Sequence, residues 1–226
     1  MIKTLKDLAG VPKFYQFFTA RTISNFGNGI SPVALAFGVL GIDGANGGSL
    51  SLVQGARTLP ILLLLIVGGT IADKYGRAKV MGLADMWLSV LILIAAWSFI
   101  SGHPSVWLLV IVGLLAGLLN GIWYPAFAGL MPILVPEEKL QSANAATGFG
   151  SNVAFMLGTA SGGVVVAVWG VGWALAVDAV TFLIAGALVY PLSKLHQKGQ
   201  VEAGEKVNFI KELKLGWHEF RTRSWL

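Results

Sequence analysis

The chain has 226 residues, of which 55% are hydrophobic and only 12% are charged. Soluble domains carry about 25% charged residues, so a water-soluble fold of this size could not cover so much apolar surface. Disordered segments are poor in aromatic and β-branched residues, which excludes disorder. The absence of cysteine excludes disulfides, thiolate nucleophiles and cysteine-based metal sites. Composition therefore indicates a polytopic membrane protein.

Six apolar segments are each long enough to cross a bilayer as a helix, which takes about 20 residues. In chain order they cover about 14–41, 51–72, 80–101, 105–131, 143–169 and 173–192. We therefore predict an all-α fold with a six-helix transmembrane bundle over residues 1–193. Residues 194–226 form a cytoplasmic linker in this interpretation. Its apolar residues at helical spacing, Phe209 to Phe220, predict an amphipathic helix on the bilayer surface.

The basic residues are distributed on one side of the predicted membrane. Apart from Arg21 and Arg57, every Lys and Arg lies before span one, between spans two and three, between spans four and five, or after span six. Because Lys and Arg stay cytoplasmic, both termini are predicted inside a multi-pass protein of the plasma or inner membrane. The net charge of +5 thus reflects topology. Nucleic-acid binding, which uses basic and aromatic side chains on a soluble face, is not expected.

An internal repeat divides the six spans into two sets of three. Three features recur at offsets of 92 to 94 residues: Asn28-Gly29-Ile30 returns as Asn120-Gly121-Ile122, Gly68-Gly69 as Gly162-Gly163, and Asp85 as Asp178. We predict repeats at about 14–101 and about 105–192. An odd number of spans per copy makes the second copy insert upside down, which is the inverted repeat of secondary transporters.

Polar residues near the middle of the spans predict a substrate cavity. Asn28 and Asn120 fall about halfway along their helices, where transporters place their sites. The proposed lining set is Asn25, Asn28, Gln54, Asn120, Trp123 and Tyr124. An apolar cavity with a few polar anchors suits a lipophilic, drug-like ligand. The alternatives are that the asparagines only bridge helices, at about 0.6 kcal/mol each, and that the aromatic residues only pack.

Four charged residues lie inside the spans, namely Arg21, Arg57, Asp85 and Asp178. A central charge costs about 2.5–3.5 kcal/mol to insert, so each is a functional candidate. Depth in the membrane predicts that Asp85 pairs with Arg21 near the cytoplasmic face, and Asp178 with Arg57 near the outer face. Such pairs either hold the bundle together or take part in protonation and gating. Asparagine does not titrate, so Asp85 and Asp178 are also the candidates for carrying a coupling proton.

The connection between spans two and three carries a recognisable signature. Its residues Gly69, Asp73, Lys74, Gly76 and Arg77 resemble the loop motif G-x-x-x-D-[RK]-x-G-[RK]-[RK] of the major facilitator superfamily, with Ala78 in place of the last base. The resemblance implies half of a major facilitator fold, with a cytoplasmic loop that takes part in gating. It also implies a partner, either a C-terminal six-helix half or a second copy.

Further motifs resemble the macrolide-efflux and enterobactin-exporter branch of that superfamily, which is similar to drug:proton antiporters. They are the segment from Pro132 to Ala145 and the segment from Trp173 to Ala179. In span five, Gly158, Gly162 and Gly163 resemble the antiporter signature G-P-x-x-G-G, with Thr159 in place of the proline. The glycines imply close helix packing, and the missing proline implies a helix without that kink.

These features predict the N-terminal half of a secondary active transporter that exports lipophilic or drug-like small molecules, with protons as a candidate coupling ion. The alternatives are a siderophore or metabolite carrier of the same superfamily and a non-transporting assembly or regulatory subunit. An intramembrane enzyme is not expected, because His103, His196 and His218 lie in a loop and the tail and no Gly-x-Ser-Gly occurs. No cofactor or metal is expected. The chain is expected to be a complete bundle but an incomplete transporter, inactive as a monomer.

Overall fold

A computed structural model of the chain describes residue 8 and residues 10–198. It contains six long helices: α2 (Pro12–Leu40), α3 (Gly47–Tyr75), α4 (Arg77–Ile100), α5 (Val106–Leu134), α6 (Leu140–Trp169) and α7 (Val171–Val189). Short 3-10 turns follow α5 at Glu137–Lys139 and α7 at Tyr190–Lys198. The amphipathic helix expected near Phe209 lies outside the described residues.

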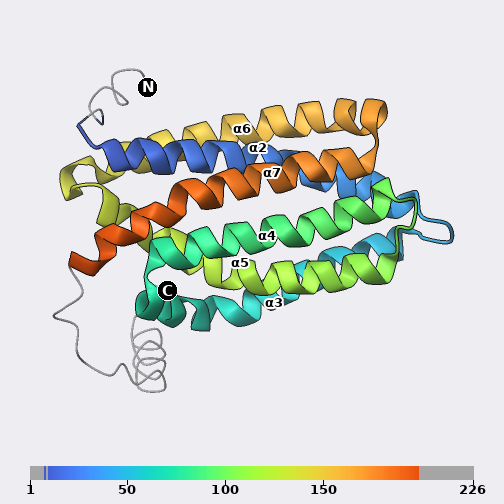
Figure 1. Cartoon of the computed structure of the whole chain (residues 1–226), viewed down its shortest axis with the longest axis horizontal. Helices are drawn as coiled ribbons and strands as arrows, with labels where there is room; N and C mark the ends of the chain where they lie inside the picture. The colour runs from blue at the N-terminus through green and yellow to red at the C-terminus, as the bar shows by residue number, and fades with distance from the viewer. Residues whose placement is uncertain (1–7, 9, 199–226) are drawn as a thin grey trace, which may run out of the picture. The chain divides into compact units, whose positions relative to one another are not determined.

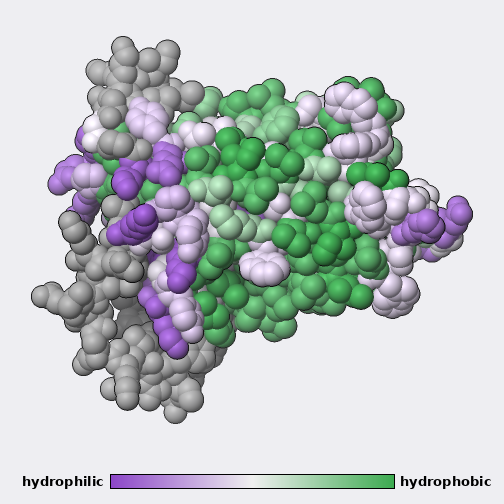
Figure 2. Space-filling view, in the orientation of Figure 1, coloured by the Kyte–Doolittle hydropathy of each residue, from purple (hydrophilic) through white to green (hydrophobic). Residues whose placement is uncertain are grey.

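The predicted all-α membrane fold is confirmed, since six helices are long and apolar enough to cross a bilayer. A broad apolar band covers the middle of the visible face, and polar residues gather towards the two ends (Figure 2). Helices that are apolar on every side are typical of a membrane environment, because no face has to be kept in water.

Two glycines end a helix and begin the next one without a loop. Gly76 has φ 91° between α3 and α4, and Gly170 has φ 85° between α6 and α7. Side chains disfavour this backbone region, so glycine permits the reversal in one residue. The expected loop between spans two and three is therefore wrong in extent. The predicted span ended at residue 72, but Asp73, Lys74 and Tyr75 continue α3, and the helix ends only at Gly76.

The helices pack side by side in the order α6, α2, α7, α4, α5, α3 (Figure 1). In the two repeats α2 corresponds to α5, α3 to α6 and α4 to α7. Replacing each helix by its counterpart gives the same order read in reverse, so the packing order is symmetric. The contact between α3 and α5 thus has its counterpart in the contact between α6 and α2. The bundle consists of two inverted three-helix repeats.

Two glycines at equivalent positions in the repeats bring helices into backbone contact. A Cβ on Gly29 of α2 would overlap the carbonyl oxygen of Phe155 in α6. A Cβ on Gly121 of α5 would lie 3.3 Å from the carbonyl oxygen of Ile61 in α3 and 2.6 Å from the Cβ of Leu64. The sequence offsets, 92 for the glycines and 94 for the carbonyls, match those of the repeat. Small residues of this kind allow close helix approach in membranes.

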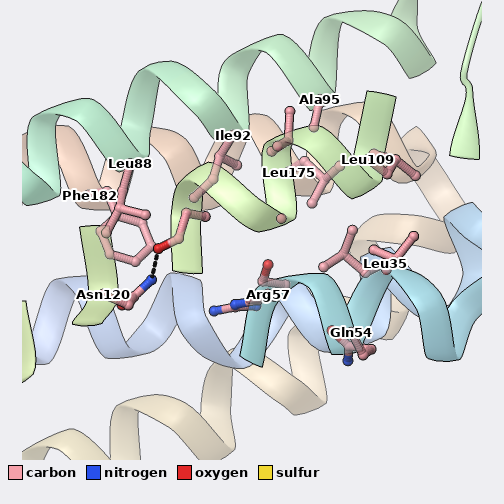
Figure 3. Close-up of a pocket in the computed structure, with 15 residues that line it drawn as sticks. Leu35, Gln54, Arg57, Leu88, Ile92, Ala95, Leu109, Asn120, Leu175 and Phe182 are labelled. Atoms are coloured by element: carbon pink, nitrogen blue, oxygen red, sulfur yellow. Dashed lines mark hydrogen bonds between the residues drawn. The ribbon is translucent and has the colours of Figure 1, made fainter. Parts of the chain in front are cut away.

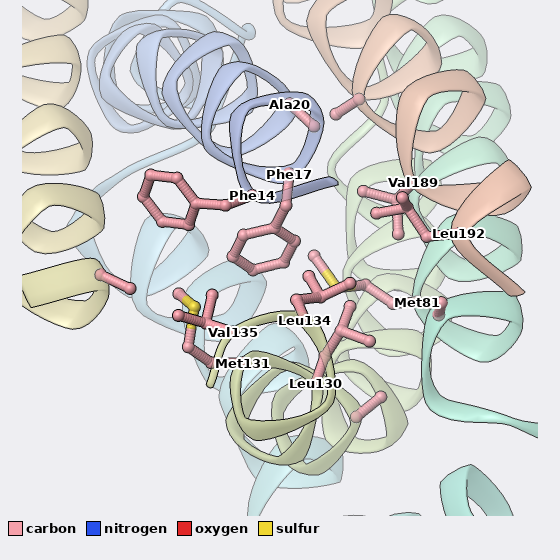
Figure 4. Close-up of a cluster of buried hydrophobic side chains, with 14 of the residues drawn as sticks. Phe14, Phe17, Ala20, Met81, Leu130, Met131, Leu134, Val135, Val189 and Leu192 are labelled. Carbon is pink, nitrogen blue, oxygen red and sulfur yellow. The ribbon is translucent and has the colours of Figure 1, made fainter. Parts of the chain in front are cut away.

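Apolar side chains form one large cluster towards each end of the bundle. Figure 4 shows the first, where Phe14 and Phe17 of α2 meet Met81, Leu130 and Val189 from three other helices. The second contains Ile30, Val39, Val53, Leu109 and Leu175. Buried polar residues lie between the two clusters along α2, α4 and α7. The candidate functional site belongs to this polar layer.

Candidate functional site

The polar layer contains three buried charged side chains, those of Arg21, Asp85 and Asp178, which are 7%, 0% and 1% exposed. No ion pair within 4.0 Å is found for any of them, or for Arg57, in the part of the chain that the structure describes. Buried charges are costly unless they are paired and hydrogen-bonded.

Arg21 is held by a hydroxyl group and by two aromatic rings. Its Nη1 donates a hydrogen bond of 2.9 Å to Ser24 Oγ. Its Cζ lies 4.4 Å from the ring centroid of Trp123 and 5.1 Å from that of Phe127. These two rings stack with centroids 5.1 Å apart. Cation–π contacts contribute about 0.5–2 kcal/mol each, so the aromatic residues of α5 stabilise a cation that has left water.

Asp85 of α4 lies within electrostatic reach of Arg21 and beside Trp123. Among the described residues, neither carboxylate oxygen has a hydrogen-bond partner, and the same is true of Arg21 Nε and Trp123 Nε1. The expected neighbours Asp85 and Arg21 therefore attract each other without closing a hydrogen-bonded ion pair.

Asp178 of α7 occupies the equivalent place in the second repeat. Its neighbour is Ser31 of α2, which corresponds to Trp123 at an offset of 92. Its carboxyl group packs on Gly27, because a Cβ there would overlap Asp178 Oδ1. The position equivalent to Arg21 is Gly113, so the second repeat offers no arginine at that position. The charge of Arg57 reaches Asp178 only beyond ion-pair distance.

A small cavity of about 50 Å³ lies among α2, α3, α4, α5 and α7. Its polar lining residues are Ser31, Gln54, Arg57 and Asn120, and the rest of its wall is apolar (Figure 3). Asn120 Nδ2 donates to the carbonyl oxygen of Ala116 at 2.8 Å within its own helix. Pockets for drug-sized ligands measure about 300–1,000 Å³, so this cavity can take only a small chemical group.

The six residues expected to line one substrate cavity are separated in this bundle. Gln54 and Asn120 line the small cavity. Asn25 Nδ2 instead donates to the carbonyl oxygen of Arg21 at 2.8 Å and to Ser151 Oγ at 3.2 Å.

The other three residues lie elsewhere. Trp123 is buried beside Arg21, Tyr124 is half exposed, and Asn28 is partly buried. Trp123 and Tyr124 are neighbours in sequence and so point about 100° apart around α5.

A larger apolar groove of about 410 Å³, which the sequence did not indicate, follows the contact between α2 and α6. Its wall includes Phe18 and Phe26 of α2 and Phe149 and Leu157 of α6. Large apolar residues eight positions apart on both helices, Phe18 and Phe26 on α2 and Phe149 and Leu157 on α6, are the sequence signal for it, and that spacing is equally typical of packing. Among the described residues, no group of three or more His, Cys, Asp or Glu side chains could hold a metal ion.

The signature around Gly76 joins three helices at one end of the bundle. Arg77 Nε donates to Asp73 Oδ1 at 2.8 Å, which links α3 and α4. The guanidinium group of Arg77 covers Gly129 of α5, where a Cβ would overlap it. Lys74 Nζ lies 5.2 Å from the ring centroid of Tyr75, and Gly69 faces Pro125 of α5. Sequence reasoning missed Gly129, because glycine in a glycine-rich helix gives no distinct signal.

The glycine motif of α6 packs against α2 on one face only. A Cβ on Gly158 would overlap the carbonyl oxygen of Phe26, and one on Gly162 would lie 3.1 Å from the Cα of Ile30. Thr159 Oγ1 donates to the carbonyl oxygen of Gly29 at 3.2 Å. Gly163 has no atom within 4 Å of such a Cβ, so it does not contribute to the contact.

Six apolar helices in two inverted repeats, with charged side chains buried between them, define a polytopic membrane protein of the transporter type. Residues 10–218 match the model of the family described as transmembrane secretion effector, and the chain belongs to this family of the major facilitator superfamily.

Three relatives illustrate the range of the family. The chain is 27% identical to the staphyloferrin A transporter of Staphylococcus aureus over 78% of its own length and 44% of the relative's. It is 24% identical to macrolide efflux protein A of Streptococcus pyogenes, over 95% of the chain and 52% of the relative. It is 28% identical to the enterobactin exporter of Salmonella choleraesuis, over 72% of the chain and 39% of the relative. The chain thus spans about half or less of the curated relatives it matches.

Proposed function

We propose that the chain is the N-terminal six-helix half of a secondary active transporter that exports lipophilic or drug-like small molecules by alternating access. The observation that carries this proposal is the inverted repeat, which occurs in the sequence and again in the symmetric order of helix packing. Transporters built in this way rock one bundle against another around a central site. Membership of the secretion-effector family supports the same conclusion.

A second bundle of six helices is the proposed partner, either in the same polypeptide or as a second copy. The matched relatives extend over about twice the length aligned here. The cavity of about 50 Å³ inside this bundle is too small for a drug-like molecule. A substrate of that size would therefore bind between two bundles rather than inside one.

The protein is proposed to lie in the cell membrane with both termini in the cytoplasm, as the distribution of Lys and Arg indicates. Export against a gradient needs a coupling ion, and protons are proposed. Asp85 and Asp178 are the buried carboxyl groups within the spans that can carry them. The paired charges at Asp73 and Arg77 are proposed to hold one gate state and to open in the other.

Two other functions remain as specific alternatives. Relatives named as a staphyloferrin A transporter and an enterobactin exporter favour a siderophore or similar metabolite as the substrate. A non-transporting assembly subunit would use the same bundle without moving a solute. Neither alternative requires catalysis, and the names of the relatives are those of transporters.

Dye transport in liposomes tests the proposal. We expect a version of the chain with a second six-helix half, or a verified dimer of residues 1–226, to move rhodamine 6G across the bilayer when a pH gradient is imposed. Protein-free liposomes and a gradient-collapsing ionophore are the controls. If neither form moves a lipophilic dye or a siderophore under any gradient, the transporter proposal is wrong and the subunit alternative gains support.

A further inference from the structure

We infer that the cavity beside Arg57 binds the anionic oxygen group of an amphiphilic organic acid, with the Arg57 guanidinium as its charged anchor. The biological meaning of this site, as a determinant of which substrates are carried, rests on the proposed transport function. The site itself follows from the position of Arg57, from the groups that share its cavity, and from the size of that cavity.

Arg57 is fixed in place by a close contact between α3 and α5. A Cβ on Gly117 of α5 would overlap the carbonyl oxygen of Arg57, and one on Gly113 would lie 3.5 Å from its backbone nitrogen. The two helices therefore touch at this point, and the partly buried Arg57 side chain lines the cavity between them (Figure 3). Charged residues inside membrane spans usually pair with another charge or with backbone carbonyls, or face a water-filled cavity.

The described part of the chain supplies no such partner at contact distance. Arg57 makes no hydrogen bond or ion pair there. Asp178 attracts it only from beyond 4.0 Å, and Asp85 lies within reach of Arg21 instead. The guanidinium fork thus remains available, and its planar pair of N–H donors matches a carboxylate or phosphate in two parallel hydrogen bonds.

The other lining residues define the chemistry of the ligand. The Gln54 side chain is exposed at the cavity wall and adds an amide donor beside the guanidinium. The remaining wall is apolar, with Leu35, Val53, Leu88, Ile92 and Val112 among its residues. A volume of about 50 Å³ admits a carboxylate-sized group but no ring system. The acidic group would enter, and the apolar body would stay outside the cavity.

Binding of pyrenebutyrate, compared with its uncharged methyl ester, tests the inference. The chain in phosphatidylcholine nanodiscs is titrated with each probe, and empty nanodiscs correct for partitioning. We expect tighter binding of the acid than of the ester. Arg57→Gln should weaken acid binding at least tenfold without changing ester binding, while Arg57→Lys should retain part of the preference. Lys13→Gln is the matched control, because it removes an exposed cation at the start of α2 that does not line the cavity. It should change neither acid binding nor ester binding.

Asp178→Asn is a second variant that leaves Arg57 intact. Removing its negative charge should tighten acid binding, because Asp178 competes for the same guanidinium from a distance. Adding phosphatidylglycerol to the nanodiscs distinguishes the two sources of the anion. Displacement of pyrenebutyrate identifies a lipid headgroup as a ligand of the site, and unchanged binding identifies a free organic acid.

An equal acid-to-ester ratio in the original chain and in Arg57→Gln would overturn the inference. If Arg57→Gln is not monodisperse, unchanged or weaker acid binding by Asp178→Asn overturns it instead. The result of this binding experiment can be distinguished from the result of the transport assay. Arg57-dependent acid binding without dye transport removes the proposed function and keeps the site, while dye transport without Arg57-dependent binding removes the site alone.

Discussion

At the scale of single residues, the repeat has produced two carboxyl groups with different neighbours. Asp85 lies near Arg21 and Trp123, whereas Asp178 has Ser31 beside it. Removing one member of a buried charge pair leaves the other uncompensated, which costs more than the pair contributes. The first carboxyl therefore belongs to a coupled set, and the second is electrostatically less constrained.

This difference predicts a non-additive response to neutralising Arg21 and Asp85. Arg21→Gln and Asp85→Asn should each destabilise the bundle by about 3 kcal/mol, because a buried charge loses its counterpart. The double variant should recover about 1 kcal/mol or more relative to the sum of the two. Unfolding of the purified protein in mixed micelles measures the three free energies. A strictly additive double variant would show that the two charges are not coupled.

At the scale of helices, close contact at Gly29 joins α2 to α6, and close contact at Gly121 joins α5 to α3. The contact explains why α2 packs on α6 and α5 on α3 in the same manner. A methyl group at Gly29 would meet the backbone oxygen of Phe155, which cannot move without moving α6. Overpacking of this type costs about 1–3 kcal/mol.

Gly29→Ala is therefore expected to lower the melting temperature of the detergent-solubilised bundle, and Gly121→Ala should do the same at the equivalent contact. Gly163→Ala and Gly55→Ala are matched controls, since a Cβ at either position has no atom within 4 Å. The controls should be neutral or slightly stabilising, because alanine favours helix by up to about 1 kcal/mol over glycine. Equal losses in all four variants would argue against these helix contacts.

The sequence predicted the helices and the repeat well, because both depend on local and periodic signals. It predicted the end of α3 too early, since apolar length was counted to Ala72 while the polar residues Asp73 and Lys74 continue the helix. Depth in the membrane could be counted along the chain and placed Arg21 near Asp85. The rotation of each helix about its axis could not be derived from the sequence. The contact of Arg77 with Gly129 and the separation of Asn25 from Asn120 were therefore not predicted.

At the scale of the whole molecule, orientation in the bilayer is the feature that connects the bundle to the direction of transport. The positive-inside rule predicts that the break at Gly76 lies in the cytoplasm and that the connection between α4 and α5 lies outside. The sequence contains no cysteine, so a single introduced thiol reports its own position without a background. Tyr75, which is 56% exposed, and His103, also exposed, lie on the two opposite connections.

His103→Cys should react with a membrane-impermeant maleimide in intact cells, while Tyr75→Cys should react only after the membrane is permeabilised. Replacing Tyr75 rather than a neighbouring lysine keeps the basic residues that set the topology. Ala174→Cys, at a fully buried position, is the control and should stay unlabelled in both conditions. Labelling of Tyr75→Cys in intact cells, with His103→Cys protected, would reverse the bundle in the membrane. Asp85 would then lie near the outer face and Arg57 near the cytoplasm, and the gate that we propose around Arg77 would face outward.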